Sequence, residues 1–146
     1  MSSRRLHLDA NVAIRLLRAD HPEHSPAARE LFAAAEAGRC TLVLDPVVVA
    51  EIVWVLTSFY RVERSAVADV LPRLLARRGV SCPDRAVLEQ AFERYASTKL
   101  DLIDCYLIAR AETADEPIAA FDRKLRRVAG GRSVEPGSLS TGDGPG

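Results

Sequence analysis

Short apolar segments alternate with longer helical patterns along almost the whole chain. The apolar runs cover residues 5–8, 41–44, 80–82 and 118–121, and their length is typical of strands. Strands that alternate with helices in this way form a parallel sheet covered by helices on both faces. The sequence therefore predicts an α/β fold, a three-layer α/β/α sandwich with a short central parallel sheet.

Capping residues and prolines mark the expected helix boundaries. Ser25-Pro26 and Asp45-Pro46 each combine an N-cap with proline at the first helical position. Further N-caps are expected at Ser65 and Asp101. These signals predict helices over roughly residues 10–19, 25–38, 45–58, 65–79, 83–96 and 101–114. A short basic helix after residue 122 and an edge strand near Val134 complete the expected order.

Length and composition indicate one domain. A chain of 146 residues can bury a real core, and we expect the domain over residues 1–135. Residues 136–146 have too little apolar content to pack, so a disordered tail is expected there. Neither a membrane span nor a secretion signal is apparent. The three cysteines lack metal-ligand spacing and are interpreted as reduced thiols of a cytoplasmic protein: Cys40, Cys82 and Cys105.

Four acidic residues each lie beside an apolar segment: Asp9, Glu51, Asp104 and Asp122. A carboxylate near an apolar core costs several kcal/mol unless it is paired, hydrogen-bonded or bound to a cation. Four such residues indicate one shared cation site. Asp9 and Asp122 each stand where a strand ends, and the ends of parallel strands lie on one rim of a sheet.

Oxygen ligands favour a hard cation such as Mg²⁺ or Mn²⁺, and the absence of His and Cys clusters argues against zinc. Such a cation can activate water and neutralise the charge of a phosphodiester. Acidic residues alone would repel a polyanion, so a nuclease built on these residues requires the cation.

The ordered motifs resemble the PIN domain family, in particular the ribonuclease toxins of VapBC toxin–antitoxin modules. Leu8-Asp9-Ala10-Asn11-Val12 is similar to the opening motif of the family, and Glu51 to its second acid. Asp104, at the start of an apolar helix, and Phe121-Asp122-Arg123-Lys124-Leu125 resemble the third and fourth motifs. The resemblance spans about residues 6–134 and implies a PIN-like nuclease domain.

The activity implied by this resemblance is a Mg²⁺- or Mn²⁺-dependent endoribonuclease, the toxin of a type II toxin–antitoxin system. It implies catalytic roles for the four acids, with Asp9 and Asp104 as metal ligands and Glu51 and Asp122 as further candidates. Asp101, three residues before Asp104, is either another ligand or the helix N-cap. Three more residues are expected to orient the substrate: Asn11, Arg123 and Lys124.

Alternatives stay open for the acids and for the function. Asp9 and Asp122 could serve as helix caps, and Glu51 could be a buried salt-bridge partner. The family commonly carries Thr or Ser shortly before its fourth acid, where this chain has Ala119-Ala120. A non-catalytic RNA-binding PIN scaffold is therefore the alternative function. A haloacid-dehalogenase-type phosphatase is disfavoured, because Asp9-Ala10-Asn11 breaks the D-x-D motif that it requires.

The expected partners are RNA, a cognate antitoxin and a second copy of the chain. Large hydrophobic residues over 47–60 and 65–77 exceed what one side of a small sheet needs, which favours a homodimer interface. Net charge is zero, so the molecule as a whole is not a basic nucleic-acid binder. A local basic cluster could bind phosphates or could be a solvated helix face: Arg123, Lys124, Arg126, Arg127 and Arg132.

Overall fold

The strands form two separate parallel sheets within residues 4–139, the part of the chain that the computed structural model describes. The larger sheet has the order β1-β2-β3, with Leu42 of the middle strand opposite Leu6 and Val80. The smaller sheet pairs β4 with β5. The strands are β1 (Arg4–His7), β2 (Cys40–Val43), β3 (Val80–Ser81), β4 (Ile118–Ala119) and β5 (Ser133–Val134). The predicted α/β class with a short parallel sheet is confirmed, although the strands are divided between two sheets.

Helices make up most of the described chain. They are α1 (Ala10–Arg18), α2 (His24–Glu36), α3 (Pro46–Ser58), α4 (Arg64–Leu75), α5 (Arg85–Ser97), α6 (Leu102–Ala114) and α7 (Arg123–Ala129). Two short 3-10 helices follow, η1 (Gly130–Arg132) and η2 (Pro136–Leu139). Every strand and helix expected from the sequence is therefore present.

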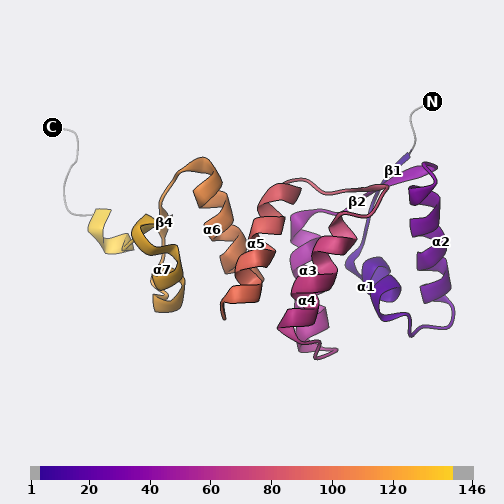
Figure 1. Ribbon diagram of the computed structural model, residues 1–146, viewed down its shortest axis with the longest axis horizontal. Coiled ribbons are helices and arrows are strands. Elements are labelled where there is room, and N and C mark those ends of the chain that lie inside the picture. The colour runs from indigo at the N-terminus through magenta and orange to yellow at the C-terminus, as the bar shows by residue number, and fades with distance from the viewer. Residues whose placement is uncertain (1–3, 140–146) are drawn as a thin grey trace.

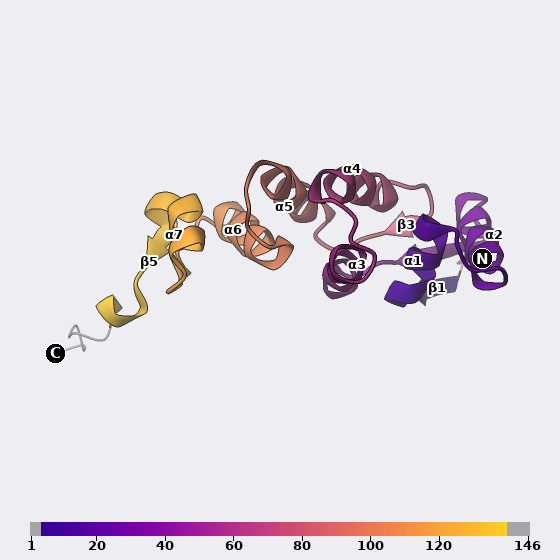
Figure 2. The same cartoon turned by 90° about the horizontal axis from the view of Figure 1, so that it is seen from below.

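The elements follow one another along a single long axis (Figure 1). The larger sheet with α1 and α2 lies at one end, α3 to α6 lie in the middle, and α7 with β4 and β5 lies at the other end. The perpendicular view shows the same order, so the separation of α1 from α7 is not an effect of projection (Figure 2). The carboxyl ends of β1 and β4 therefore lie far apart within one chain.

Most of the predicted helix starts are confirmed, but two N-caps are wrong. Asp45 and Asp101 occupy N-cap positions as expected. Ser25 instead lies inside α2, because the Nδ1 atom of His21 accepts hydrogen bonds from the Glu23 and His24 amides at 3.2 and 2.9 Å. The start of α4 is also earlier than predicted, with Glu63 rather than Ser65 at its N-cap.

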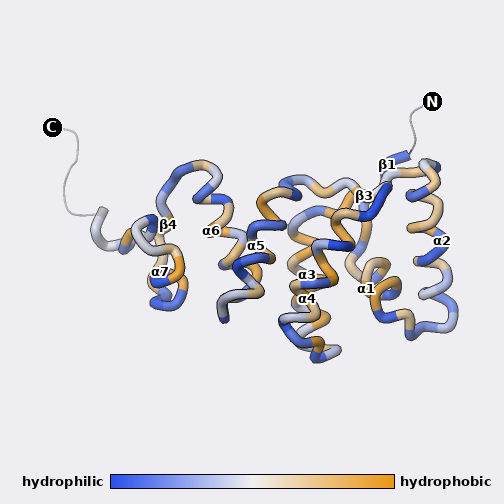
Figure 3. The backbone as a smooth tube through the Cα atoms, in the orientation of Figure 1, coloured by the Kyte–Doolittle hydropathy of each residue, from blue (hydrophilic) through white to orange (hydrophobic). Residues whose placement is uncertain are grey.

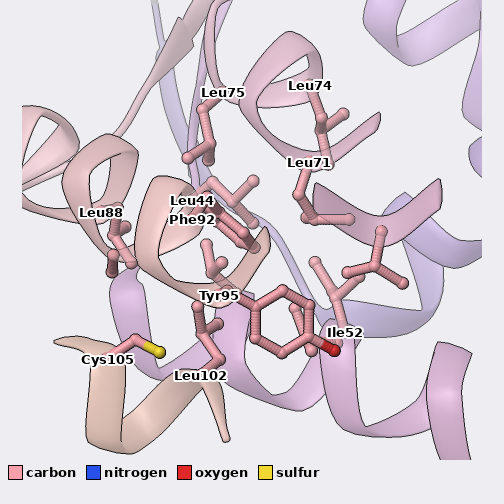
Figure 4. Packing of buried hydrophobic residues seen from close by; sticks show 14 of the residues in the cluster. Leu44, Ile52, Leu71, Leu74, Leu75, Leu88, Phe92, Tyr95, Leu102 and Cys105 are labelled. Atoms are coloured by element: carbon pink, nitrogen blue, oxygen red, sulfur yellow. The ribbon is translucent and has the colours of Figure 1, made fainter. Parts of the chain in front are cut away.

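The main core lies between the middle helices and the larger sheet. Figure 4 shows Ile52 of α3, Leu71 of α4 and Phe92 of α5 in the same packed region, with Leu102 at the start of α6 beside it. Ile52 and Leu71 are fully buried, and Phe92 is nearly so. Burial of one such side chain contributes about 1.5–3 kcal/mol, so this region holds the middle of the molecule together.

Several large apolar side chains lie on the surface instead. Figure 3 shows that hydrophobic segments continue along α3, α6 and the end of β4. The exposed large hydrophobic residues are Val47, Trp54, Phe59, Ile103, Leu107 and Phe121. None of the helices in the described residues has the length and apolar content needed to cross a bilayer.

The cysteines and the C-terminal segment can be compared directly with the predictions. Cys40 and Cys105 are buried, Cys82 is half-buried, and all three are free thiols as expected. Of the tail predicted to be disordered over 136–146, residues 136–139 form η2 instead. Residues 140–146 lie outside the described part of the chain.

Candidate active site

Asp9 and Asn11 lie at the start of α1, directly after β1. Asp9 is the exposed N-cap residue of α1, and its side chain makes no capping hydrogen bond within residues 4–139. Its carboxylate is therefore available to other partners, and capping is not its role here. Asn11 is exposed and lines a cleft of about 490 Å³ between α1 and α2, together with Val12 and Leu31.

Glu51 lies in the second turn of α3 and points to solvent. Its neighbours Ile52 and Val53 are buried, whereas Glu51 itself is exposed. A buried salt bridge is therefore not the role of this residue. Helices α1 and α3 pack against each other, so Asp9 and Glu51 lie on neighbouring helices, and α3 also contacts α6, which carries Asp104.

Asp104 lies in the first turn of α6 and is only partly exposed. Its pKa is raised above the ordinary value of a carboxyl, first by partial burial and then by the negative charges of Asp101 and Asp122. Lys124 acts in the opposite direction. The structure therefore brings Asp104, Asp101 and Asp122 into one electrostatic neighbourhood.

Asp122 is the N-cap of α7. Its Oδ1 atom accepts a hydrogen bond from the Leu125 amide at 2.8 Å, so the capping role considered for this residue is confirmed. A carboxylate has several acceptor positions, and one capping bond leaves the others free to bind a cation. Capping and metal binding are compatible for this residue.

The expected convergence of four carboxylates does not occur within one chain. Asp9 belongs to α1 and Asp122 to α7, which lie at opposite ends of the long axis (Figures 1 and 2). Residues 4–139 contain no group of three or more His, Cys, Asp or Glu side chains that could hold a metal ion. The physical reason is the strand pairing. β4 pairs with β5 and not with β1, so the two strands do not share a rim.

The donor set nevertheless suits a hard cation in its chemistry. Mg²⁺ commonly binds through one or two carboxylates and keeps several waters. Asp104 and Asp122 supply two carboxylates; the charge of Asp122, after burial and the charge of Asp101, raises the pKa of Asp104, and a cation would relieve that repulsion. Asp9, which was expected at the same ion, lies on α1, at the opposite end of the molecule from Asp122.

The basic cluster predicted after Asp122 is partly neutralised by neighbouring acids. Arg126 pairs with Glu135 at 3.8 Å, and Arg132 with Asp115 at 3.0 Å. The other three members are exposed, and the described residues offer them no ion pair: Arg123, Lys124 and Arg127. These three are the members available to bind phosphates.

One polar pair beside the larger sheet was missed by sequence reasoning. Nδ1 of His7 lies 3.0 Å from Oδ2 of Asp45, across the carboxyl ends of β1 and β2. The signal was present, because both residues stand where neighbouring parallel strands end. Trp54 of α3 is 66% exposed.

Comparison with known proteins identifies the family. The PIN domain matches residues 6–131, which is most of the chain. The chain belongs to the PIN domain family, and its mixed α/β structure is consistent with the α/β/α fold of that family. PIN domains are generally nucleases, so membership indicates hydrolase chemistry on nucleic acid. No curated protein matches the chain.

Proposed function

We propose that this protein is a metal-dependent endoribonuclease and the toxin of a type II toxin–antitoxin system. One observation carries the proposal: Asp122 caps the basic helix α7, and its negative charge acts on Asp104 in the first turn of α6. Carboxylates suited to a hard cation thus lie directly beside side chains suited to phosphates. This pairing is what cleavage of a phosphodiester requires.

In this proposal Asp104 and Asp122 hold Mg²⁺ or Mn²⁺, and the catalytic roles predicted for Asp9 and Glu51 require α1 and α3 to meet the same ion. The bound cation would supply an activated water and neutralise charge on the scissile phosphate. Arg123, Lys124 and Arg127 would hold the flanking phosphates and so fix the position of the RNA. Asn11, next to Asp9, would orient the substrate.

The proposed partners are a single-stranded RNA and a small antitoxin. Bases of single-stranded or loop RNA are unstacked, so the backbone there can enter a site that a duplex cannot. An antitoxin tail with acidic residues would bind the basic residues of α7, and an arginine side chain would reach the carboxylates. Both arrangements would block the same site.

A non-catalytic RNA-binding scaffold is the second candidate. It is favoured by the separation of Asp9 on α1 from Asp122 on α7. The two residues before Phe121 are alanines, so no hydroxyl assists Asp122 from that position. In that case the basic residues of α7 would bind RNA without hydrolysis.

Cleavage of a labelled single-stranded RNA tests the proposal. We expect cleavage with Mg²⁺ or Mn²⁺, none in EDTA, and none with Asp104→Asn, while RNA binding persists. Asp69→Asn is the matched control, because Asp69 is an exposed acid of α4 that pairs with Arg73. Undiminished cleavage in EDTA would rule out the metal mechanism. Binding without cleavage under any divalent ion would favour the scaffold.

A further inference from the structure

The larger sheet has an open edge at β1. Within residues 4–139, β1 pairs with β2 alone. The Leu8 amide donates to Val43 across that pairing at 2.9 Å. Because hydrogen-bonding directions alternate along a strand, the amides of Arg5 and His7 face the open edge. An unpaired edge of this kind is a template for a further strand.

The smaller sheet has a matching open edge at β4. Its Ala120 amide donates to Val134 of β5 at 3.3 Å, so the amides of Ala119 and Phe121 face away from β5. Both sheets are parallel. A parallel alignment of β4 beside β1 would satisfy both edges and extend the same hydrogen-bonding pattern.

Large apolar side chains flank the edge of β4. Phe121 is 79% exposed and lies between β4 and Asp122. Ile103 and Leu107, one turn apart on α6, are exposed at 67% and 43%. Helix α6 packs mainly on α5 and also contacts β4, so these side chains border the open edge of β4. Uncovered apolar area around an open strand edge marks an interaction surface.

We propose that two copies of this chain exchange their C-terminal units, each made of β4, α7 and β5. In the pair, β4 of each copy adds in parallel to β1 of the other. Within one chain the two edges lie at opposite ends of the long axis, so a second copy must supply the missing strand. Each chain carries both edges, so the exchange is reciprocal and closes as a two-fold pair.

The exchange would also assemble the candidate site. Asp9 follows β1 and Asp122 follows β4, and parallel strands bring their carboxyl ends to one rim. Asp9 of one copy would then face Asp122 of the other. This inference rests on the proposed nuclease function for its activity readout only; the assembly itself is measured independently.

Mixing two inactive variants tests the shared site. Asp9→Asn and Asp122→Asn chains, unfolded and refolded together, should form hybrid pairs in which one of two sites is intact. Half of the pairs are hybrids, so we expect about a quarter of wild-type cleavage and of tight Mn²⁺ binding. The matched control is Asp9→Asn with Glu51→Gln, which damages the same half of the site in both chains and should restore nothing.

Light scattering measures the assembly directly. We expect twice the 15.9 kDa chain mass for the wild type. Phe121→Asp should give a monomer with unchanged helical content, because Phe121 is exposed in the single chain. Phe59→Asp replaces another exposed phenylalanine, 74% exposed at the end of α3, and should leave the pair intact.

The outcomes separate the two proposals. A wild-type monomer, an open-ended series of larger species, or no recovery of Mn²⁺ binding in the first mixture would overturn the exchange. A paired wild-type protein whose first mixture regains Mn²⁺ binding but which cleaves no RNA would support the exchange and overturn the nuclease function.

Discussion

The guanidinium carbon of Arg64 lies 3.7 Å from the centre of the Tyr95 ring. The same side chain donates from Nη2 to the carbonyl oxygens of Tyr95, Thr98 and Leu100 at 2.7, 3.0 and 2.7 Å. Arg64 begins α4, and the three carbonyls end α5 and lead into α6. One side chain thus fixes the segment that precedes Asp101 and Asp104.

Arg64→Ala should lower the free energy of unfolding by about 2–4 kcal/mol, because it removes a cation–π contact and leaves three carbonyls without their donor. Urea unfolding followed by circular dichroism measures the loss. Arg73→Ala is the control. Its ion pair with Asp69 is exposed, so it should cost well under about 1 kcal/mol. Equal losses would contradict the role assigned to Arg64.

Asp122 variants should separate helix capping from catalysis. Asp122→Asn keeps an acceptor for the Leu125 amide and removes the charge, so it should abolish cleavage with little change in stability. Asp122→Ala should abolish cleavage and also lose about 1 kcal/mol, the usual value of an N-cap. Both properties are measured on the same samples. Full cleavage by Asp122→Asn would show that capping is the only role of this residue.

The raised pKa of Asp104 predicts a dependence of stability on pH in EDTA. A carboxyl whose pKa is higher in the folded state disfavours folding once it ionises. The contribution of Asp104 to the free energy of unfolding should therefore fall as the pH rises from the ordinary carboxyl pKa of 3.8 through the raised pKa of the folded state. Asp104→Asn should lack this loss, so the difference in unfolding free energy between variant and wild type should grow from pH 3 to pH 7. A constant difference across that range would refute the shift.

Replacing Arg123, Lys124 and Arg127 together by Ala should weaken RNA binding. Each phosphate contact on single-stranded nucleic acid contributes about 0.7 to the slope of log affinity against log salt, so the slope should flatten by about 2. Fluorescence anisotropy across a salt series gives the slope. The control removes three exposed arginines elsewhere in the chain: Arg29, Arg39 and Arg78. An unchanged slope in the first variant would show that Arg123, Lys124 and Arg127 do not contact the RNA phosphates.

Local signals in the sequence predicted the elements well, because the residues that set them are adjacent in the chain. Asp45 followed by proline, and Asp101 before an apolar run, are N-caps in the structure. The prediction failed at Ser25, where His21 supplies the acceptor for the first amides of α2. That competition depends on the geometry of a turn, which residue type alone does not specify.

The order of the strands in the sheets could not be predicted from local sequence signals. Alternating strands and helices predict parallel pairing, but not which strands are neighbours. β4 has two residues, and its choice between β5 and β1 depends on contacts far apart in sequence. The same choice decides whether Asp9 and Asp122 meet in one chain. The catalytic roles of the four acids therefore remain predictions, whereas the placement of each acid on its element is confirmed.

The opposite placement of α1 and α7 has a consequence for dosage. A site assembled from two chains forms in proportion to the square of the chain concentration when pairs are scarce. If the site is shared as proposed, freshly synthesised protein at low copy number would have little activity, and activity would rise steeply above a threshold set by the dissociation constant of the pair. An inhibitor would need to keep the free chain below that threshold and would not have to occupy every site.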